Sequence, residues 1–270
     1  MFRVMIFLPL LTLFLFYPLT GAAASRPRLR VLTCEEPPAN YMEHGRITGI
    51  STDIVRELMR RTRSRGVVQL WPWPRAYNTA LHEANVVLFT AGHTARRDKL
   101  FYWVGPLFKK RWIFLARRKS GYRFSDWHLA REVKSIVVMR DDARSQLLHE
   151  VGFRNVIEVG SHLQALRMLA AGRASLWPTS DMEAAFIARQ GGIPWSCFSR
   201  AAVIKDIYPA IIISKGTALK VVHDWQRAWE AMSGDGSLNA IARHWSQKLN
   251  IDIHLQGRML VFGARQGAVE

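Results

Sequence analysis

Acidic residues are scarce in this chain of 270 residues. It has 21 aspartate and glutamate residues against 38 lysine and arginine residues, which gives a formal net charge of +17. Such a charge attracts anions, nucleic acid among them. The basic residues are spread through apolar, periodic segments rather than gathered in one tail, so we interpret them as a basic, solvated surface and expect no nucleic-acid partner.

Cysteine is also rare, because Cys34 and Cys197 are the only two. No C-x-x-C or histidine-rich spacing is present, so we predict neither a metal site nor a cofactor. In an oxidising compartment the two thiols are able to pair. The sequence does not show that they meet, and the pairing therefore stays open at this point.

Long apolar runs are absent after the first two dozen residues. There, Arg3 precedes an apolar run from Val4 to Leu19, and small residues follow. This is the pattern of a secretory signal peptide. The alternative is a retained membrane anchor, but the run is shorter than the about 20 residues that a span needs, and Pro9 and Pro18 interrupt it. We predict cleavage after Ala24 and a periplasmic protein.

Apolar strands alternate with amphipathic helices along the rest of the chain, which indicates an α/β fold. The pattern restarts near Trp112, as expected for a second α/β unit. The predicted strands are 29–33, 67–71, 86–90, 112–116, 135–139, 156–159, 175–178 and 208–214. The predicted helices are 53–63, 76–83, 143–151, 163–171, 182–190, 219–233 and 238–249. Ser51 or Thr52 is expected to cap the first of these helices.

Short motifs follow one another in a fixed order between residues 28 and 250. They are GISTD at 49–53, TARR at 94–97 with GP at 105–106, AAGR at 170–173, and YPAIIISKG at 208–216. Trp229, Asp235-Gly236 and Trp245 continue the order. Together these blocks resemble the family 3 extracytoplasmic solute-binding proteins, the polar-amino-acid type that serves ABC importers.

The resemblance implies a type II periplasmic binding protein fold. Two α/β lobes, joined by two crossing strands, would close by a hinge motion over a ligand in the cleft between them. The implied divisions are a signal peptide at 1–24, a first lobe at 26–113 plus 206–255, a second lobe at 114–205, and a loosely held tail at 256–270. The resemblance also implies a monomer that captures a small amino-acid-like or carboxylate ligand and presents it to an ABC permease.

Arg97 is the first candidate for ligand binding. It matches the family arginine that binds a ligand α-carboxylate, and a guanidinium group donates two parallel hydrogen bonds to such a group. The alternative is a surface arginine beside Arg96. Thr90 and Gly92 match family positions that donate near that carboxylate, although Gly92 keeps only its amide. His93 is expected to be an ordinary surface or packed residue.

Further candidates follow the first two predicted strands, because the carboxyl ends of parallel strands face the crevice in open α/β sheets. Trp71, Trp73 and Arg75 come after the second strand. Either tryptophan, with Trp73 slightly favoured, is expected to stack on the ligand, or else both pack beneath the loop. Glu35 and Tyr41 come after the first strand, and Glu35 suits an ammonium group.

The second predicted lobe offers two acidic positions. Asp141 and Asp142 stand where the family often has Gly-Thr, with Arg140 in place of the glycine; they either contact the ligand or cap the following helix. Ser180 and Asp181 follow the next strand. The resemblance assigns Asp181, offset by about one position, to the α-ammonium group of the ligand.

Two other functions remain open beside a solute-binding protein. A periplasmic dehydratase-like enzyme on the same fold would need a general acid or base, for which Glu35 is the candidate. A sensor would bind the ligand without transporting it. No nucleophile–base arrangement is visible in the sequence, so we predict a binding protein without catalytic residues.

Overall fold

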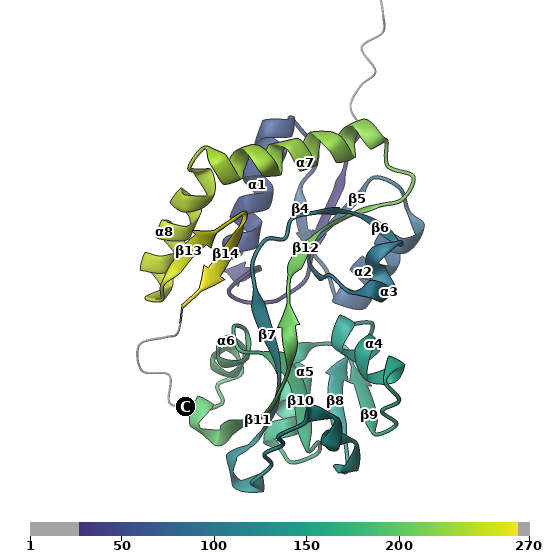
Figure 1. Ribbon diagram of the computed structural model, residues 1–270, viewed down its shortest axis with the longest axis vertical. Coiled ribbons are helices and arrows are strands. Elements are labelled where there is room, and N and C mark those ends of the chain that lie inside the picture. Colours follow the sequence, from purple (N-terminus) through teal and green to yellow (C-terminus); the bar gives the residue numbers. More distant parts are fainter. Residues whose placement is uncertain (1–26, 264–270) are drawn as a thin grey trace, which may run out of the picture.

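The computed structural model describes residues 27–263, which form two α/β lobes stacked one above the other (Figure 1). The predicted signal peptide at residues 1–24 and residues 264–270 of the predicted tail lie outside this range. Within it, no helix is both long and apolar enough to cross a membrane. The predicted strands and helices are present, with ends shifted by a few residues.

The sheet of the first lobe has the order β4-β1-β5-β12-β6. Its strands are β1 (Arg30–Thr33), β4 (Val68–Leu70), β5 (Val86–Gly92), β6 (Phe101–Val104) and β12 (Pro209–Ser214). β1 is parallel to β4 and β5, whereas β12 is antiparallel to β5 and β6. A strand from late in the chain therefore completes a sheet that the early strands begin.

Helices cover both faces of this sheet, which explains why β5 reads as a continuous apolar run. Val87 and Phe89 pack in the core under α1 (Ile50–Thr62), α7 (Leu219–Gly234) and α8 (Ser237–Leu249). Val86 and Leu88 pack on the opposite side with α2 (Trp73–His82). The short helix α3 (Ala95–Asp98) follows β5.

The sheet of the second lobe has the order β11-β7-β10-β8-β9. Its strands are β7 (Lys110–Arg117), β8 (Ile136–Met139), β9 (Val156–Val159), β10 (Leu176–Ser180) and β11 (Phe198–Ile207). Its helices are α4 (Ala143–Glu150), α5 (His162–Ala170) and α6 (Ala184–Gln190), with the short 3₁₀ turns η1 (Arg118–Ser120), η2 (Trp127–Glu132) and η3 (Trp195–Cys197). β8 is parallel to β9 and β10, and β7 is antiparallel to β10 and β11.

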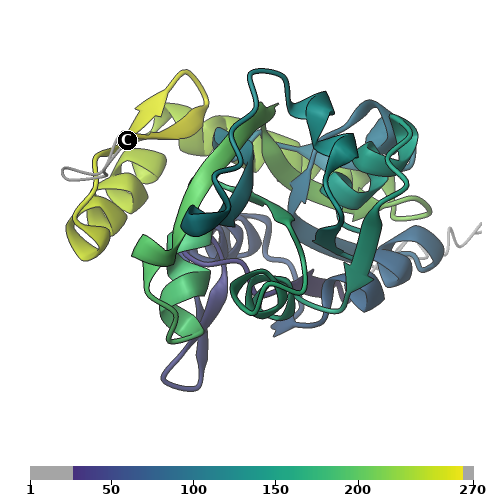
Figure 2. The same ribbon diagram turned by 90° about the horizontal axis from the view of Figure 1, so that it is seen from below.

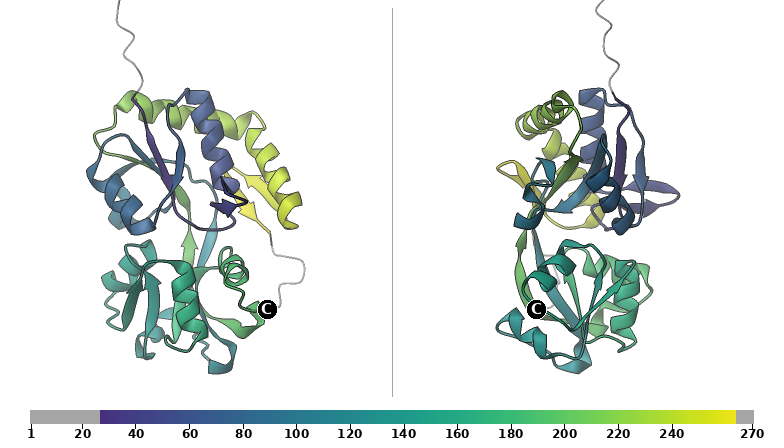
Figure 3. Two further views of the ribbon diagram at one scale, coloured as in Figure 1. Left: turned by 180° about the vertical axis from the view of Figure 1, so that it is seen from behind. Right: turned by 90° about the vertical axis from the view of Figure 1, so that its right-hand side faces the viewer.

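The chain crosses between the lobes twice, once from β6 to β7 and once from β11 to β12 (Figures 1 and 3). β7 and β11 pair antiparallel from Lys110 to Arg117, so the two connections lie side by side. A paired connection of this kind is suited to hinge bending, because few backbone positions need to change.

The start of α1 corrects one prediction. The helix begins at Ile50, and its N-cap residue is Gly49 rather than Ser51 or Thr52. Gly49 has a φ of +125°, and a Cβ atom there would overlap the carbonyl oxygen of Ala39. The close approach of the Ala39 backbone requires a glycine at this point, and the two hydroxyl residues are buried in the first turn instead.

The predicted loose tail is wrong for residues 256–262. β13 (Ile253–Gln256) and β14 (Met259–Phe262) form an antiparallel hairpin beside α8, at one side of the molecule (Figure 2). Leu260 is fully buried, and the Phe262 ring packs edge-on against Phe108 at 5.7 Å. Strands this short carry too little periodicity to be found in the sequence. A second hairpin, β2 (Tyr41–Glu43) with β3 (Arg46–Thr48), escaped prediction for the same reason.

The two cysteines do not form a bridge. Cys34 is buried after β1, Cys197 is exposed in the second lobe, and both are free thiols. Burial raises the pKa of the Cys34 thiol well above its usual value.

Candidate functional site

The two lobes touch where α2 and α3 of the first lobe meet the turn between β8 and α4 of the second (Figure 1). Nε1 of Trp73 and Nη2 of Arg97 both donate to the carbonyl oxygen of Asp141, each at 2.8 Å. Nε of Arg97 also donates to Oε1 of Gln146 at 2.8 Å. These bonds cross from one lobe to the other, so the structure is a closed arrangement.

The guanidinium group of Arg97 is fully buried at this junction. Its Cζ atom lies 4.6 Å from the ring centroid of Tyr77 and 5.2 Å from that of Trp73, and the two rings stack on each other. Both hydrogen-bond acceptors of Arg97 are neutral, and its Nη1 has no partner. No carboxylate among residues 27–263 forms an ion pair with it.

Arg97 is thus a buried cation without an ion-paired carboxylate among residues 27–263; burial lowers the pKa of its guanidinium, and Tyr77 and the nearby Asp142 offset this only in part. Burying an unpaired charge is costly, and pairing the charge with a hydrogen-bonded anion removes much of that cost. The arrangement is chemically suited to a carboxylate, which would supply both the missing charge and an acceptor for Nη1.

A second group of charged side chains lies buried at the same junction, and we call it the ion-pair cluster. Its members are Glu36, Lys110, Asp142, Arg144 and Glu183. Nζ of Lys110 pairs with Glu36 of the first lobe and lies 3.5 Å from Oε2 of Glu183 in the second. Arg144 pairs with Glu183 and, at 2.7 Å, with Asp142. Every charge in this cluster has an opposite charge beside it.

The pKa values inside the ion-pair cluster follow from burial and these partners. Burial raises the pKa of Glu36 to about 8, because it outweighs the attraction of Lys110. For Glu183 and Asp142, Arg144 outweighs burial and holds each pKa below its usual value. His162, whose Nε2 lies 2.9 Å from Arg144, has its pKa lowered to about 4 by burial and by that neighbouring cation. Glu36 is therefore the cluster member that exchanges a proton near neutral pH.

Thr90 and Gly92 lie on β5, close to the junction. Thr90 is buried with a φ of +64°, and its hydroxyl donates to Oδ1 of Asn40 within its own lobe. A Cβ atom at Gly92 would lie 3.4 Å from both Cβ of Ala143 and Cζ2 of Trp112 in the second lobe. These are ordinary van der Waals distances, so the two lobes meet closely at Gly92 without requiring a glycine there.

Other candidates near Arg97 in sequence have different neighbours. The guanidinium of Arg75 lies over the Trp71 ring, with Cζ 4.1 Å from the ring centroid, and both residues belong to the first lobe. His93 is exposed, and its Nε2 lies 2.8 Å from Oδ1 of Asp98. Tyr41 packs edge-on against Trp245 of α8, on the face of the sheet opposite to α2. Among residues 27–263, no hydrogen bond, ion pair or ring contact joins these side chains to Arg97.

Glu35 is half-buried and accepts from the Met42 amide and, across the junction, from Nε2 of Gln190 at 3.3 Å. Burial raises the pKa of Glu35. Asp181 is exposed and accepts from the Arg111 amide at 3.1 Å. Neither carboxylate is joined to Arg97 by a hydrogen bond or ion pair among the described residues.

The remaining candidates of the second lobe have structural contacts. The carboxylate of Asp142 accepts from the Arg144 amide and caps α4, as the capping alternative predicted. Asp141 contributes its carbonyl oxygen, while the residue itself is exposed. Ser180 is buried, and its hydroxyl accepts from the Glu183 amide.

Sequence reasoning missed Tyr77 and most of the ion-pair cluster. Tyr77 lies one helical turn after Trp73, a spacing that places both rings on one face of α2. Glu36 directly follows the candidate Glu35, Glu183 comes two residues after the candidate Asp181, and each follows a strand. Periodicity does not show which of two nearby carboxylates turns inward, so the sequence offered no signal that separated them.

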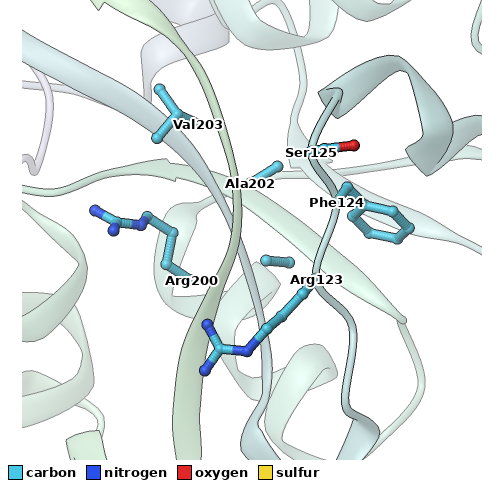
Figure 4. A pocket seen from close by; sticks show the side chains of 7 residues that line it. Arg123, Phe124, Ser125, Arg200, Ala202 and Val203 are labelled. Atoms are coloured by element: carbon cyan, nitrogen blue, oxygen red, sulfur yellow. The ribbon is translucent and has the colours of Figure 1, made fainter. Parts of the chain in front are cut away.

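An open hollow of about 270 Å³ lies elsewhere, on the second lobe (Figure 4). Its lining includes Arg123, Phe124 and Arg200, and none of the residues that meet at the junction. Among residues 27–263, no group of three or more histidine, cysteine or acidic side chains is placed to hold a metal ion.

Comparison with solved structures supports the two-lobed architecture. A histidine kinase sensor domain similar to periplasmic binding proteins superposes with a TM-score of 0.73 at 16% identity, covering 82% of this chain and 96% of the other. The arginine-, lysine-, histidine-binding protein ArtJ of Geobacillus stearothermophilus gives 0.69 at 16% identity, covering 81% and 95%. The ancestral amino acid-binding protein AncCDT-1, a precursor of cyclohexadienyl dehydratase, gives 0.66 at 16% identity, covering 81% and 94%.

At this level of identity the similarity shows the fold, which is that of the two-lobed periplasmic binding proteins. No curated protein sequence gives a significant match. The family of bacterial extracellular solute-binding proteins, family 3, matches residues 29–248, nearly the whole described chain. This confirms the resemblance seen in the sequence motifs, and the chain belongs to family 3 of the bacterial extracellular solute-binding proteins.

Proposed function

We propose that this protein captures a small carboxylate or amino-acid-like ligand between its lobes and presents it to an ABC permease. The signal-peptide pattern at residues 1–24 supports a periplasmic site of action. The proposed role is binding without catalysis, and the proposed partners are the ligand and a permease of the inner membrane. The structures similar to this chain include both binding proteins and a sensor domain.

The observation that carries the proposal is the unpaired, buried guanidinium of Arg97. It lies at the contact between the lobes, where a ligand carboxylate would touch both lobes at once. On binding, the carboxylate would take the place of neutral acceptors such as the Asp141 carbonyl. Charge-assisted hydrogen bonds of this kind are about twice as strong as neutral ones, so the exchange favours the ligand complex.

A thermal-shift screen of amino acids and organic acids tests the proposal, because a ligand that binds only the folded protein raises its melting temperature. For any probe that binds, Arg97→Met is expected to weaken affinity by about 2–4 kcal/mol in titration calorimetry, since a buried charged hydrogen bond is lost. Arg96→Met is the matched control: Arg96 is the exposed neighbour on α3, and its loss makes the same change in net charge. Equal affinities in both variants would rule out Arg97 as the anchor.

A further inference from the structure

We infer that closing the two lobes takes up a proton, which the carboxyl groups of Glu36 in the first lobe and Glu183 in the second hold between them. The free protein therefore closes in mildly acidic surroundings and opens in alkaline ones. The inference goes beyond ligand capture, because it concerns the protein without its ligand. It rests on the way in which the ion-pair cluster spans the junction.

Glu36 and Glu183 reach the same ammonium group from opposite lobes. Glu36 follows β1 of the first lobe, Glu183 precedes α6 of the second, and Lys110 begins β7, where the chain crosses between them. Nζ of Lys110 pairs with Glu36 and lies 3.5 Å from Oε2 of Glu183. The two carboxyl groups are also hydrogen-bonded to each other, and both are buried. Ionised carboxylates only accept hydrogen bonds, so this bond requires a proton on one of the two.

The charges of the ion-pair cluster also call for one proton. Three carboxylates face two cations, so the cluster carries one excess negative charge when every acid is ionised. At neutral pH, burial keeps the Cys34 thiol neutral, and the lowered pKa of His162, about 4, keeps that ring neutral as well. Arg97 forms no ion pair with any of the three carboxylates among residues 27–263, and the one whose charge acts on it is Asp142. A buried excess charge is costly, and one added proton removes it.

Among the three carboxylates, Glu36 is the one that takes the proton. Glu183 is held in its ionised form by Arg144, and it also accepts from a hydroxyl and an amide of β10, each at 3.2 Å. Asp142 is held ionised by Arg144 as well. In the described part of the chain, Glu36 accepts a hydrogen bond from Lys110 alone. Burial therefore outweighs the attraction of Lys110 and raises the pKa of Glu36 to about 8.

Opening the lobes would release this proton. When the lobes separate, Glu36 leaves Glu183 and gains water, so the pKa of its carboxyl group returns toward its ordinary value of 4.5. Between that value and about 8, the closed protein holds a proton that the open protein does not. The closed-to-open ratio therefore falls by about tenfold for each pH unit between pH 6 and pH 8. Protonation thus acts on the same equilibrium that a ligand between the lobes would shift.

Small-angle X-ray scattering of the ligand-free protein at pH 6 and pH 9 tests the inference, because opening increases the radius of gyration. The sample is first unfolded and refolded, so that no ligand from the expression host remains in it. We expect the wild type to be closed at pH 6 and open at pH 9, with a closed-to-open ratio about 50-fold or more lower at pH 9. Circular dichroism at both pH values shows that the fold itself is kept.

Two matched variants assign the effect to Glu36. Glu36→Gln carries an amide that is neutral at every pH and still donates to Glu183, so it should stay closed at both pH values. Glu83→Gln is the control, because Glu83 is an exposed carboxylate that pairs with Arg30 within the first lobe. It makes the same chemical change away from the junction and should open at pH 9 as the wild type does.

A wild type with the same radius of gyration at both pH values would overturn the inference, and so would opening of Glu36→Gln at pH 9. If Glu36→Gln does not fold, the ¹³C carboxyl shift of Glu36 in labelled wild-type protein takes its place. We expect this shift to titrate near pH 8, and titration near pH 4.5 would contradict the inference. None of these results depends on Arg97, so the proposed ligand capture is tested separately.

Discussion

Arg97 and Arg144 are both buried where the lobes meet, yet only Arg144 has its charge balanced within the chain. Arg144 lies between Asp142 and Glu183, and those carboxylates hold its pKa above the usual range. Arg97 has the opposite shift, since burial lowers its pKa, and Tyr77 and the charge of Asp142 offset that effect only in part. Burial alone does not separate the two arginines, but the charge of their partners does.

The difference teaches how one interface can hold both a structural cation and a ligand-binding cation. Arg144 joins the N-terminal ends of α4, α5 and α6 within the second lobe through Asp142, His162 and Glu183, so these partners are present whether the lobes are open or closed. Arg97 reaches the second lobe only through neutral acceptors, which a ligand can replace. The predictions below test this contrast, from the largest expected effect to the smallest.

Removing each arginine should destabilise the protein to very different extents in the absence of ligand. Arg144→Met is expected to lower the free energy of unfolding by about 3–5 kcal/mol, because it leaves two buried carboxylates without their cation. Arg97→Met should cost less than about 1 kcal/mol, since it removes a buried charge that has no ion-paired carboxylate among the described residues. Urea denaturation followed by circular dichroism measures both values. Similar losses in the two variants would contradict the contrast.

The pH dependence of stability should identify Glu36 as the proton-exchanging member of the ion-pair cluster. Its pKa is raised from 4.5 to about 8 in the folded protein. The folded state therefore binds more protons than the unfolded state between these values, and stability falls as the pH rises through this range. From pH 6.5 to pH 8 the Glu36 contribution to the free energy of unfolding should fall by about 1–2 kcal/mol.

Glu36→Gln removes this contribution and is the variant to compare with the wild type over the same interval. His162, with a lowered pKa of about 4, is neutral in the folded state above pH 6.5, whereas in the unfolded state its ordinary pKa of 6.5 means that it still titrates there; both proteins contain His162, so the comparison cancels its contribution. Its own contribution has the opposite sign, since stability is lost as the pH falls from 6.5 toward 4. Identical pH profiles above pH 6.5 for the two proteins would refute the assignment to Glu36.

Trp73→Phe should produce a moderate loss of ligand affinity. It keeps an aromatic ring beside Arg97 and removes the indole donor that bonds to the Asp141 carbonyl across the lobes. We expect a loss of about 1 kcal/mol, roughly fivefold in Kd, for the best-binding carboxylate probe in calorimetry. Trp71→Phe is the control, because the Trp71 ring contacts Arg75 of its own lobe rather than the second lobe. A larger effect at Trp71 would place the ligand elsewhere.

Asp141→Asn should have the smallest effect. The contact to Arg97 and Trp73 comes from the backbone carbonyl of Asp141, and asparagine also tolerates its φ of +57°. Affinity for the same probe should stay within about twofold of the wild type, a change below about 0.5 kcal/mol. A tenfold change would show that the Asp141 carboxylate itself takes part in binding or in closure.

Much of the fold was predictable because it depends on local periodicity. The apolar run of β5 and the stripe of α1 are visible in the sequence, as are the glycines that end the second-lobe helices α5 and α6. The start of α1 was not predictable, because glycine is required at position 49 only by the close approach of the Ala39 backbone. The β13–β14 hairpin was missed because its burial depends on Phe108, which is far away in the chain.

The sequence by itself determined the α/β class, the family, and Arg97 as the first candidate for an anion. Motifs and hydrophobic periodicity involve residues that are close together in the chain, so the sequence alone shows them. Only the tertiary structure decided which buried cation is balanced, because Glu36 meets Lys110, and Arg144 meets Glu183, through folding rather than through nearness in sequence. Charge pairing depends on distance in space, so the folded chain is needed to show that, among the described residues, no carboxylate forms an ion pair with Arg97.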